Sequence, residues 1–186
     1  SMAQEHIRAF ADVPDVEVAG IHSRTRFRAE ALAQQHGVRD VCDSVAELYE
    51  RTQADLVVVA VPETAMNPVS RACFEYPWTA LLEKPPGYSL LDAEEVSRAA
   101  SQHERNVIVG LNRRFLSSTQ AVTCDLERNN GRRFIHVQDQ QDKAQAAELE
   151  HPQVVVDNWM YANSIHLIDY LRLFGRGSVA SVTPVV

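Results

Sequence analysis

The sequence predicts an α/β protein with a doubly wound parallel sheet, followed by the start of a second α/β domain with an antiparallel sheet. Through residue 111, short runs of β-branched residues alternate with longer amphipathic stretches, which is the pattern of strand–helix–strand units. The run at 56–61 is apolar throughout and stops at Pro62, as expected of a central strand covered on both faces. From residue 133 polar and apolar residues alternate instead, which is typical of a one-sided antiparallel sheet.

The individual elements follow from these patterns and from their end signals. Gly37 is placed to end a helix in the left-handed conformation, and Ser44 with Glu47 has capping-box spacing. Helices with apolar residues at helical spacing are expected at 26–36, 44–50, 67–75, 89–102, 115–128 and 164–174. Strands are expected at 16–21, 56–61, 79–82, 107–109, 133–140 and 179–186, and the polar stretch 141–153 is expected to be a loop.

Composition excludes several classes of protein. The 186 residues are 45% hydrophobic and carry a net charge of −7 with scattered basic residues, so a packed core is expected and nucleic acid is not an expected partner. We find neither an apolar run long enough to span a bilayer nor a leader peptide, so a cytoplasmic protein is expected. The three cysteines lack the CxxC spacing of metal or redox sites, so we expect buried thiols and no metal.

Lys84 is the first candidate for acid–base chemistry. The chain uses arginine for nearly all its positive charge and has only two lysines, Lys84 and Lys143. Arginine keeps its proton in a working enzyme whereas lysine can release it. Lys84 also follows directly on the expected strand 79–82, and ligands of parallel sheets bind at the carboxyl ends of strands. A plain surface role for Lys84 stays open on this argument.

His166 is the second candidate. It lies on the expected helix 164–174, and Asp169 follows three residues later on the same face, where a carboxylate could orient the imidazole. A lysine and a histidine that face one cleft could act as an acid–base pair. A histidine bonded only to the backbone is the alternative, and spacing alone does not exclude it.

Three strings of the sequence resemble the Gfo/Idh/MocA family, the relatives of glucose-fructose oxidoreductase and inositol dehydrogenase. They are EKP at 83–85, GLNRRF at 110–115 and IHLIDYL at 165–171, in the family's order and with similar gaps. The resemblance implies an incomplete Rossmann-like dinucleotide-binding domain at 1–111 and a partial substrate or oligomerisation domain at 112–186. It also implies NAD(P)-linked oxidation or reduction of a sugar, cyclitol or related polyol, in a homodimer or homotetramer.

The resemblance also assigns roles to individual residues. Lys84 matches the lysine that contacts the reacting hydroxyl and the cofactor, and His166 matches the catalytic histidine. Val61 and Pro62 match the loop beneath the nicotinamide and ribose. The other matches near the cofactor are Glu83, Pro85 with an unusual peptide turn, Asn112 and Arg114.

The residues that follow the expected strand at 16–21 bear on the choice of cofactor. Ser23 and Arg24 stand where an acidic side chain would hold the adenosine ribose of NAD. A hydroxyl and a guanidinium suit a 2'-phosphate instead, so we expect NADP, with NAD as the alternative and Arg28 as a helper. A solvated Arg24 without a role is the competing interpretation.

The sequence departs from the family pattern in places. Ala3 aligns with the third small position of the glycine-rich fingerprint and His6 with a histidine of the next helix, so the first strand and most of the phosphate cradle are expected to be missing. The carboxyl end is also expected to be truncated. Ala162 stands where many relatives have an aspartate, and Met66 where relatives often have a histidine. Because Lys84 and His166 are present, a hydride-transferring oxidoreductase is the first expectation. Ala162 and the missing glycine-rich fingerprint favour the alternative, a non-catalytic cofactor- or sugar-sensing regulator.

Overall fold

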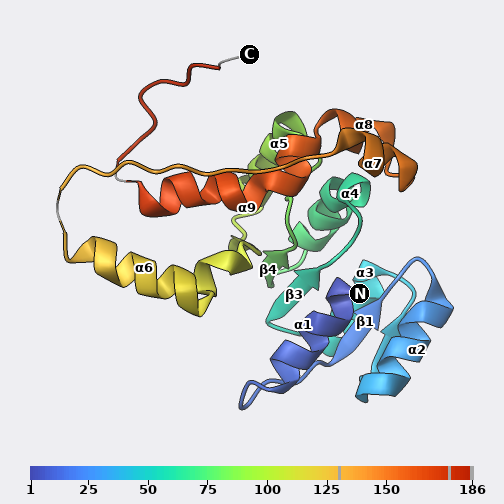
Figure 1. Cartoon of the computed structure of the whole chain (residues 1–186). Coiled ribbons are helices and arrows are strands. Elements are labelled where there is room, and N and C mark those ends of the chain that lie inside the picture. Colours follow the sequence, from blue (N-terminus) through green and yellow to red (C-terminus); the bar gives the residue numbers. More distant parts are fainter. Residues whose placement is uncertain (130, 176, 185–186) are drawn as a thin grey trace. The chain divides into compact units, whose positions relative to one another are not determined.

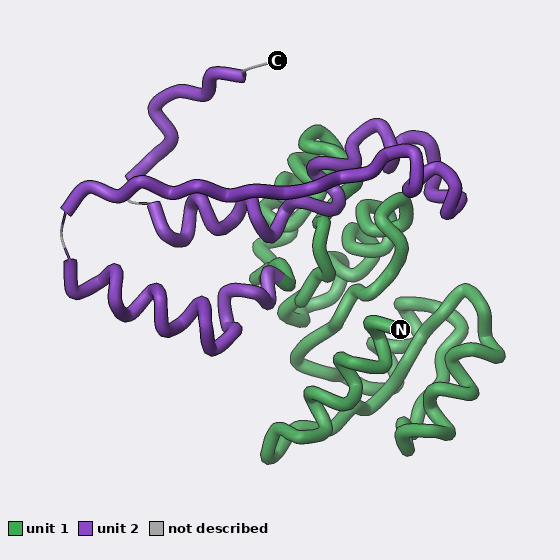
Figure 2. The backbone as a smooth tube through the Cα atoms, in the orientation of Figure 1, with its two compact units in different colours: residues 1–110 green, residues 111–186 purple. Residues whose placement is uncertain are grey.

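The structure is a computed structural model that describes residues 1–129, 131–175 and 177–184 (Figure 1). The chain divides into two compact units, residues 1–110 and 111–186 (Figure 2). Unit 1 holds every strand found in the described part of the chain, and unit 2 is built from helices and extended segments.

Unit 1 contains two parallel sheets. In the first, β1 (Gly20–His22) pairs with β2 (Asp40–Cys42). In the second, β4 (Thr79–Leu82) lies between β3 (Leu56–Val59) and β5 (Val107–Val109). All of these pairs are parallel. The α/β class with a parallel sheet is therefore confirmed, although β1 is shorter than the expected strand at 16–21.

Five helices accompany these strands, and their end signals act largely as expected. Gly37 ends a helix with a φ of 69°, and the Ser44 hydroxyl accepts a hydrogen bond from the Glu47 amide at 3.0 Å. The helix expected at 67–75 begins one turn earlier, at Glu63, with Pro62 as its N-cap, and the strand expected at 56–61 ends at Val59. The helices are α1 (Met2–Ala11), α2 (Arg26–His36), α3 (Val45–Thr52), α4 (Glu63–Phe74) and α5 (Leu90–Gln102).

Two apolar clusters stabilise unit 1. The larger joins β3 and β4 to α4 and α5 around the buried Phe74 and Trp78. The smaller joins α1 and α2 to the first sheet through Ile7, Ala33 and Val38. Cys42 and Cys73 are buried as expected, and burial raises the pKa of the Cys73 thiol to about 12. Cys124 is exposed, so the expectation of three buried thiols was wrong.

Unit 2 corrects the expectation of an antiparallel sheet. Residues 133–140 and 179–184 form no strand, and residues 185 and 186 of the expected last strand lie outside the described residues. A strand needs a partner for its backbone groups, and no other segment described in unit 2 pairs with these two. The helices of unit 2 are the 3-10 helix η1 (Asn112–Phe115), α6 (Ser117–Glu127), α7 (Lys143–Glu148), α8 (Gln153–Asp157) and α9 (Trp159–Phe174).

Side chains hold the extended segment 133–141 beside α9 (Figure 1). At one end the Arg133 guanidinium donates to the carbonyl oxygen of Phe174 at 2.7 Å and to that of Leu126. At the other end the Asn163 amide donates to the Gln141 side-chain oxygen at 2.8 Å. The alternating pattern thus predicted an extended backbone correctly. It did not predict that side-chain hydrogen bonds to α9 and α6, and not a neighbouring strand, hold this segment. The expected loop at 141–153 contains α7, and α9 begins five residues before the expected Ser164.

Candidate active site

The carboxyl edge of the larger sheet brings several predicted site residues together. The register aligns Val59 with Leu82 and Leu82 with Val109, so all three strands end at one level. Two further backbone bonds continue the ladder, Glu83 N to Val59 O at 2.9 Å and Gly110 N to Leu82 O at 2.8 Å. The predicted pairs Val61–Pro62 and Glu83–Lys84 therefore leave the sheet at the same edge.

Glu83 is a buried carboxylate with two partners. Its Oε1 lies 2.7 Å from Nε2 of His6 on α1, and its Oε2 accepts the backbone N–H of Lys84 at 3.1 Å. Only 11% of the Glu83 side chain is exposed. The sequence placed Glu83 beside the cofactor, and the structure shows its two oxygens bound within the protein. The partnership with His6 was missed, because no local spacing links positions 6 and 83.

Lys84 follows Glu83 at the end of β4 and is half-buried. The Lys84–Pro85 peptide bond is cis, which is the unusual turn expected here, and Pro85 is fully buried. Among the described residues, no carboxylate forms an ion pair with the Lys84 ammonium. Its three donors are therefore available for a ligand.

The loop after Lys84 is fixed where it joins α5. The Asp92 carboxylate accepts the Tyr88 N–H at 3.1 Å and the side-chain amide of Asn67, on α4, at 2.7 Å. The same Asn67 amide donates to Glu95 at 2.9 Å. A Cβ atom at Gly87 would lie 2.7 Å from both the Ala93 nitrogen and an Asp92 oxygen. Ser89 and Asp92 have capping spacing that indicated the helix start, but nothing in the sequence pointed to Asn67.

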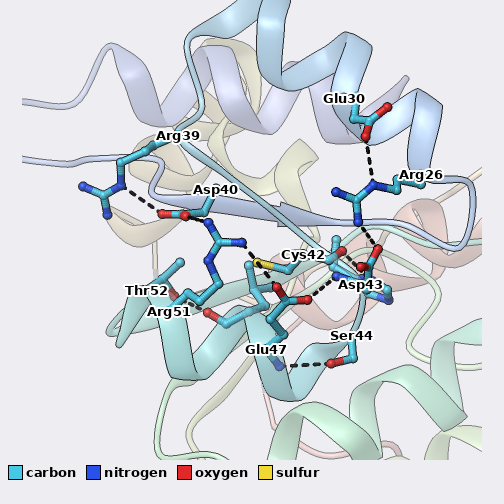
Figure 3. A network of polar contacts seen from close by, with 12 residues as sticks. Arg26, Glu30, Arg39, Asp40, Cys42, Asp43, Ser44, Glu47, Arg51 and Thr52 are labelled. Carbon is cyan, nitrogen blue, oxygen red and sulfur yellow. Dashed lines mark hydrogen bonds and ion pairs between the residues drawn. The ribbon is translucent and has the colours of Figure 1, made fainter.

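The end of β1 carries the residues predicted to select the cofactor. The Ser23 hydroxyl accepts the Thr25 N–H at 3.2 Å, and Arg24 is exposed. Arg26 is bound to Glu30 at 2.8 Å and to Asp43 (Figure 3). No ion pair of Arg24 or Arg28 is found within the described residues. Arg24 thus keeps an unneutralised charge just beyond β1.

The same network braces β2 against α3 (Figure 3). Asp40, the first residue of β2, binds Arg39 at 2.9 Å and also binds Arg51 of α3. The hydrogen bond from Arg39, followed by the charge of Arg51, holds the pKa of Asp40 below its usual range. Because Asp40 begins the strand next to β1, this network supports the strand that leads to Ser23.

Ala3, which the sequence predicted to lie near the cofactor phosphates, is at the start of α1. Ala3 is half-buried in the first turn, and the Ser1 hydroxyl accepts the Gln4 N–H at 3.4 Å as the N-cap. Ile7 of the same helix is buried in the smaller apolar cluster. The helix that carries Ala3 and His6 is therefore anchored in unit 1.

In unit 2 an ion pair changes the expected role of Asp169. The Arg114 guanidinium binds both oxygens of the Asp169 carboxylate, with Nε at 2.6 Å from Oδ2. This carboxylate was expected to orient His166, and it is instead committed to Arg114. His166 is buried in α9, with Ala162 buried one turn before it. Asn112 lies exposed in η1.

The described residues hold neither a metal-binding cluster nor a membrane-spanning helix. No group of three or more His, Cys, Asp or Glu side chains there could hold a metal ion. No helix in residues 1–129, 131–175 and 177–184 has the length and apolar character needed to cross a membrane.

The sequence profile described as "Oxidoreductase family, NAD-binding Rossmann fold", the Gfo/Idh/MocA family, matches residues 1–111. The chain belongs to this family. The match spans unit 1, which holds the parallel strands and the cis Lys84–Pro85 bond. The resemblance inferred from the three sequence strings is thereby confirmed.

Individual relatives show the same fold. The chain is 25% identical over 122 residues to a 4-carboxy-2-hydroxymuconate-6-semialdehyde dehydrogenase of a Sphingobium strain, covering 66% of this chain and 39% of that protein. A myo-inositol dehydrogenase from Lactobacillus casei, solved with NAD(H) and myo-inositol, gives a TM-score of 0.64 at 19% identity, covering 69% of this chain and 39% of that one. The apo scyllo-inositol dehydrogenase from the same species gives 0.72 at 17% identity, covering 94% and 52%. The chain thus spans about half or less of these relatives.

Proposed function

We propose that the protein carrying this chain transfers a hydride between a nicotinamide cofactor and a carbon–oxygen centre of a sugar, cyclitol or related polyol. One observation carries the proposal: a lysine without a carboxylate partner in the described residues stands at the carboxyl edge of a parallel sheet, in a family of NAD-binding oxidoreductases. The inositol dehydrogenases among the structural relatives support the substrate class.

In this proposal Lys84 handles the proton of the substrate hydroxyl. A bound nicotinamide would supply the hydride acceptor for the C–H bond that breaks during oxidation. The hydroxyl proton passes to Nζ of Lys84, and reduction reverses both transfers. The positive charge of the ammonium stabilises the oxygen as it gains negative charge, and His166 is the second proposed catalytic residue. Val61, Pro62 and Asn112 contribute to cofactor binding, with Arg114 positioned through Asp169.

The charge beyond β1 supports NADP as the cofactor. Arg24 is exposed and has no carboxylate partner in the described residues, whereas Arg26 is already neutralised by Glu30 and Asp43. A guanidinium beside a hydroxyl fits a 2'-phosphate by charge and hydrogen bonding. Ser23 and Arg24 would therefore hold the adenosine end of the cofactor.

A fluorescence titration with NADPH and NADH tests the cofactor assignment. We expect tighter binding of NADPH, and Arg24→Ala should weaken it about tenfold, since a hydrogen bond to a charged group contributes about 1.5–3 kcal/mol. Binding of NADH should stay the same. Arg128→Ala, an exposed arginine of unit 2, is the control. Equal loss of both cofactors in Arg24→Ala would remove the 2'-phosphate role.

A screen of sugars and cyclitols for a change in nicotinamide absorbance tests the reaction. Turnover of at least one polyol is expected. A specific observation favours a second function: the buried Ala162 replaces the aspartate of many relatives one turn before His166. Cofactor binding without turnover of any tested polyol or aldehyde would favour a cofactor- or sugar-sensing regulator instead.

A further inference from the structure

We propose that His6 is a positioning residue for Lys84, acting through the carboxylate of Glu83; this rests on the proposed function of Lys84. The three groups form a continuous chain of contacts, from His6 Nε2 to Glu83 Oε1 at 2.7 Å and from Glu83 Oε2 to the Lys84 N–H at 3.1 Å. An ionised carboxylate only accepts hydrogen bonds, so the His6 ring is the donor.

The helix gives His6 a fixed position. His6 lies on α1, and the next residue, Ile7, is 8% exposed within the apolar cluster that also holds Ala33 and Val38. The His6 side chain itself is 20% exposed. A ring carried by an anchored helix can direct a flexible carboxylate, whereas a mobile surface histidine could not.

The Glu83 carboxylate lies beside Gly110. A Cβ atom at Gly110 would lie 3.7 Å from Glu83 Oε1 and 3.3 Å from the Leu82 carbonyl oxygen, so this part of Glu83 lies close to the next strand end. A buried carboxylate that loses a donor is destabilised, because it no longer has the hydrogen bond that offsets its removal from water. Without His6, Glu83 would have to rotate toward water, and Oε2 would leave the Lys84 N–H.

The bond to the Lys84 N–H fixes the peptide from which the catalytic side chain extends. A shift of about 1 Å in a catalytic group can reduce turnover about 100-fold. The sheet holds the preceding peptide, because the Glu83 amide is bonded to Val59 O at 2.9 Å. Removal of His6 is expected to lower kcat while cofactor binding stays unchanged.

The scarcity of lysine makes a direct test possible. Labelling with ¹⁵N-lysine gives two backbone amide signals, those of Lys84 and Lys143, which Lys143→Arg assigns. His6→Phe should shift the Lys84 signal and speed its hydrogen exchange, and the Lys143 signal should not change. His6→Gln, whose amide can reach Glu83, should restore the Lys84 signal. His103→Phe, at the exposed end of α5, is the control.

His6→Asn provides a second variant if His6→Phe does not fold, because its amide is too short to reach Glu83. An unchanged Lys84 signal in His6→Phe or His6→Asn would overturn the proposal. In the turnover assay, kcat should fall about tenfold or more in these variants and recover in His6→Gln, with KM for the cofactor unchanged. A shifted Lys84 signal with normal kcat would overturn the catalytic part. Absence of turnover in the unmodified protein would instead refute the proposed function, and the amide signals would still decide whether His6 positions Lys84.

Discussion

Unit 1 and unit 2 position their candidate catalytic residues by different means. In unit 1, Lys84 follows a strand paired on both sides, and its neighbours are fixed by buried polar contacts. In unit 2, His166 lies on a helix beside an extended segment that has no ladder partner in the described residues. Sheet register therefore fixes the site in unit 1, whereas side-chain contacts such as Arg114–Asp169 do so in unit 2.

Two phenylalanines show how far the packing differs. Phe74 of unit 1 is 0% exposed, and Phe134 of unit 2 is 94% exposed. An interior without voids resists changes of volume, so unit 1 should tolerate substitution poorly. The following predictions test this difference, beginning with the largest effect.

Replacement of each of these two phenylalanines by alanine should give the largest difference in stability between the units. Phe74→Ala should lower the free energy of unfolding by about 3–5 kcal/mol, the usual cost of a cavity left by an aromatic residue. Phe134→Ala should change it by no more than about 0.5 kcal/mol. Urea unfolding of the two variants measures both values. Similar losses in the two variants would show that Phe134 is buried in solution.

Two asparagines give a smaller contrast. Asn67 bridges Asp92 and Glu95 and is 8% exposed, so Asn67→Ala should cost about 1–3 kcal/mol by removing a donor from the buried Asp92 carboxylate. Asn163→Ala removes an exposed bond to Gln141 and should cost less than about 0.5 kcal/mol. Thermal or urea unfolding distinguishes the two. A mild Asn67→Ala variant would mean that water can replace its amide.

Replacement of two aspartates, Asp40 and Asp139, should give the smallest change in stability, and this change should depend on pH. The pKa of Asp40 is lowered by the Arg39 hydrogen bond, and that of exposed Asp139 is lowered chiefly by the Ser164 hydroxyl. A lowered pKa stabilises the fold above the unfolded value of about 3.9, and this stabilisation is lost as pH falls through the folded pKa.

Asp40→Asn should therefore be less stable than the unmodified chain at pH 7, and the difference should shrink as pH falls below about 3.9. Asp139→Asn should show a weaker effect of the same sign, because exposed groups are screened by water. Urea midpoints measured from pH 7 down to about pH 2 report both. A difference for Asp40→Asn that does not vary with pH would contradict the assigned pKa.

Local patterns predicted much of unit 1. The apolar runs and the caps at Gly37, Ser44 and Ser89 fix where helices and strands begin and end, and the structure shows those caps. The EKP string after a buried strand placed Lys84 at the sheet edge, because parallel strands end at a common edge.

Contacts between distant residues could not be predicted in this way. His6 meets Glu83 and Asn67 meets Asp92 only after the chain has folded. The alternating residues at 133–140 indicated extended backbone, but a strand also requires a neighbour, which no local pattern specifies. Asp169 has the helical spacing to contact His166, yet Arg114 binds both its oxygens, since a bidentate guanidinium pair is the stronger interaction.

The two lysines provide the most direct test of the central claim, that Lys84 moves the substrate proton. Turnover of Lys84→Ala and Lys143→Ala should be compared on a polyol accepted by the unmodified protein, with cofactor binding measured alongside. Lys84→Ala should lose about 100-fold or more in kcat and Lys143→Ala should keep its rate. A Lys84→Ala variant with normal kcat would contradict the claim.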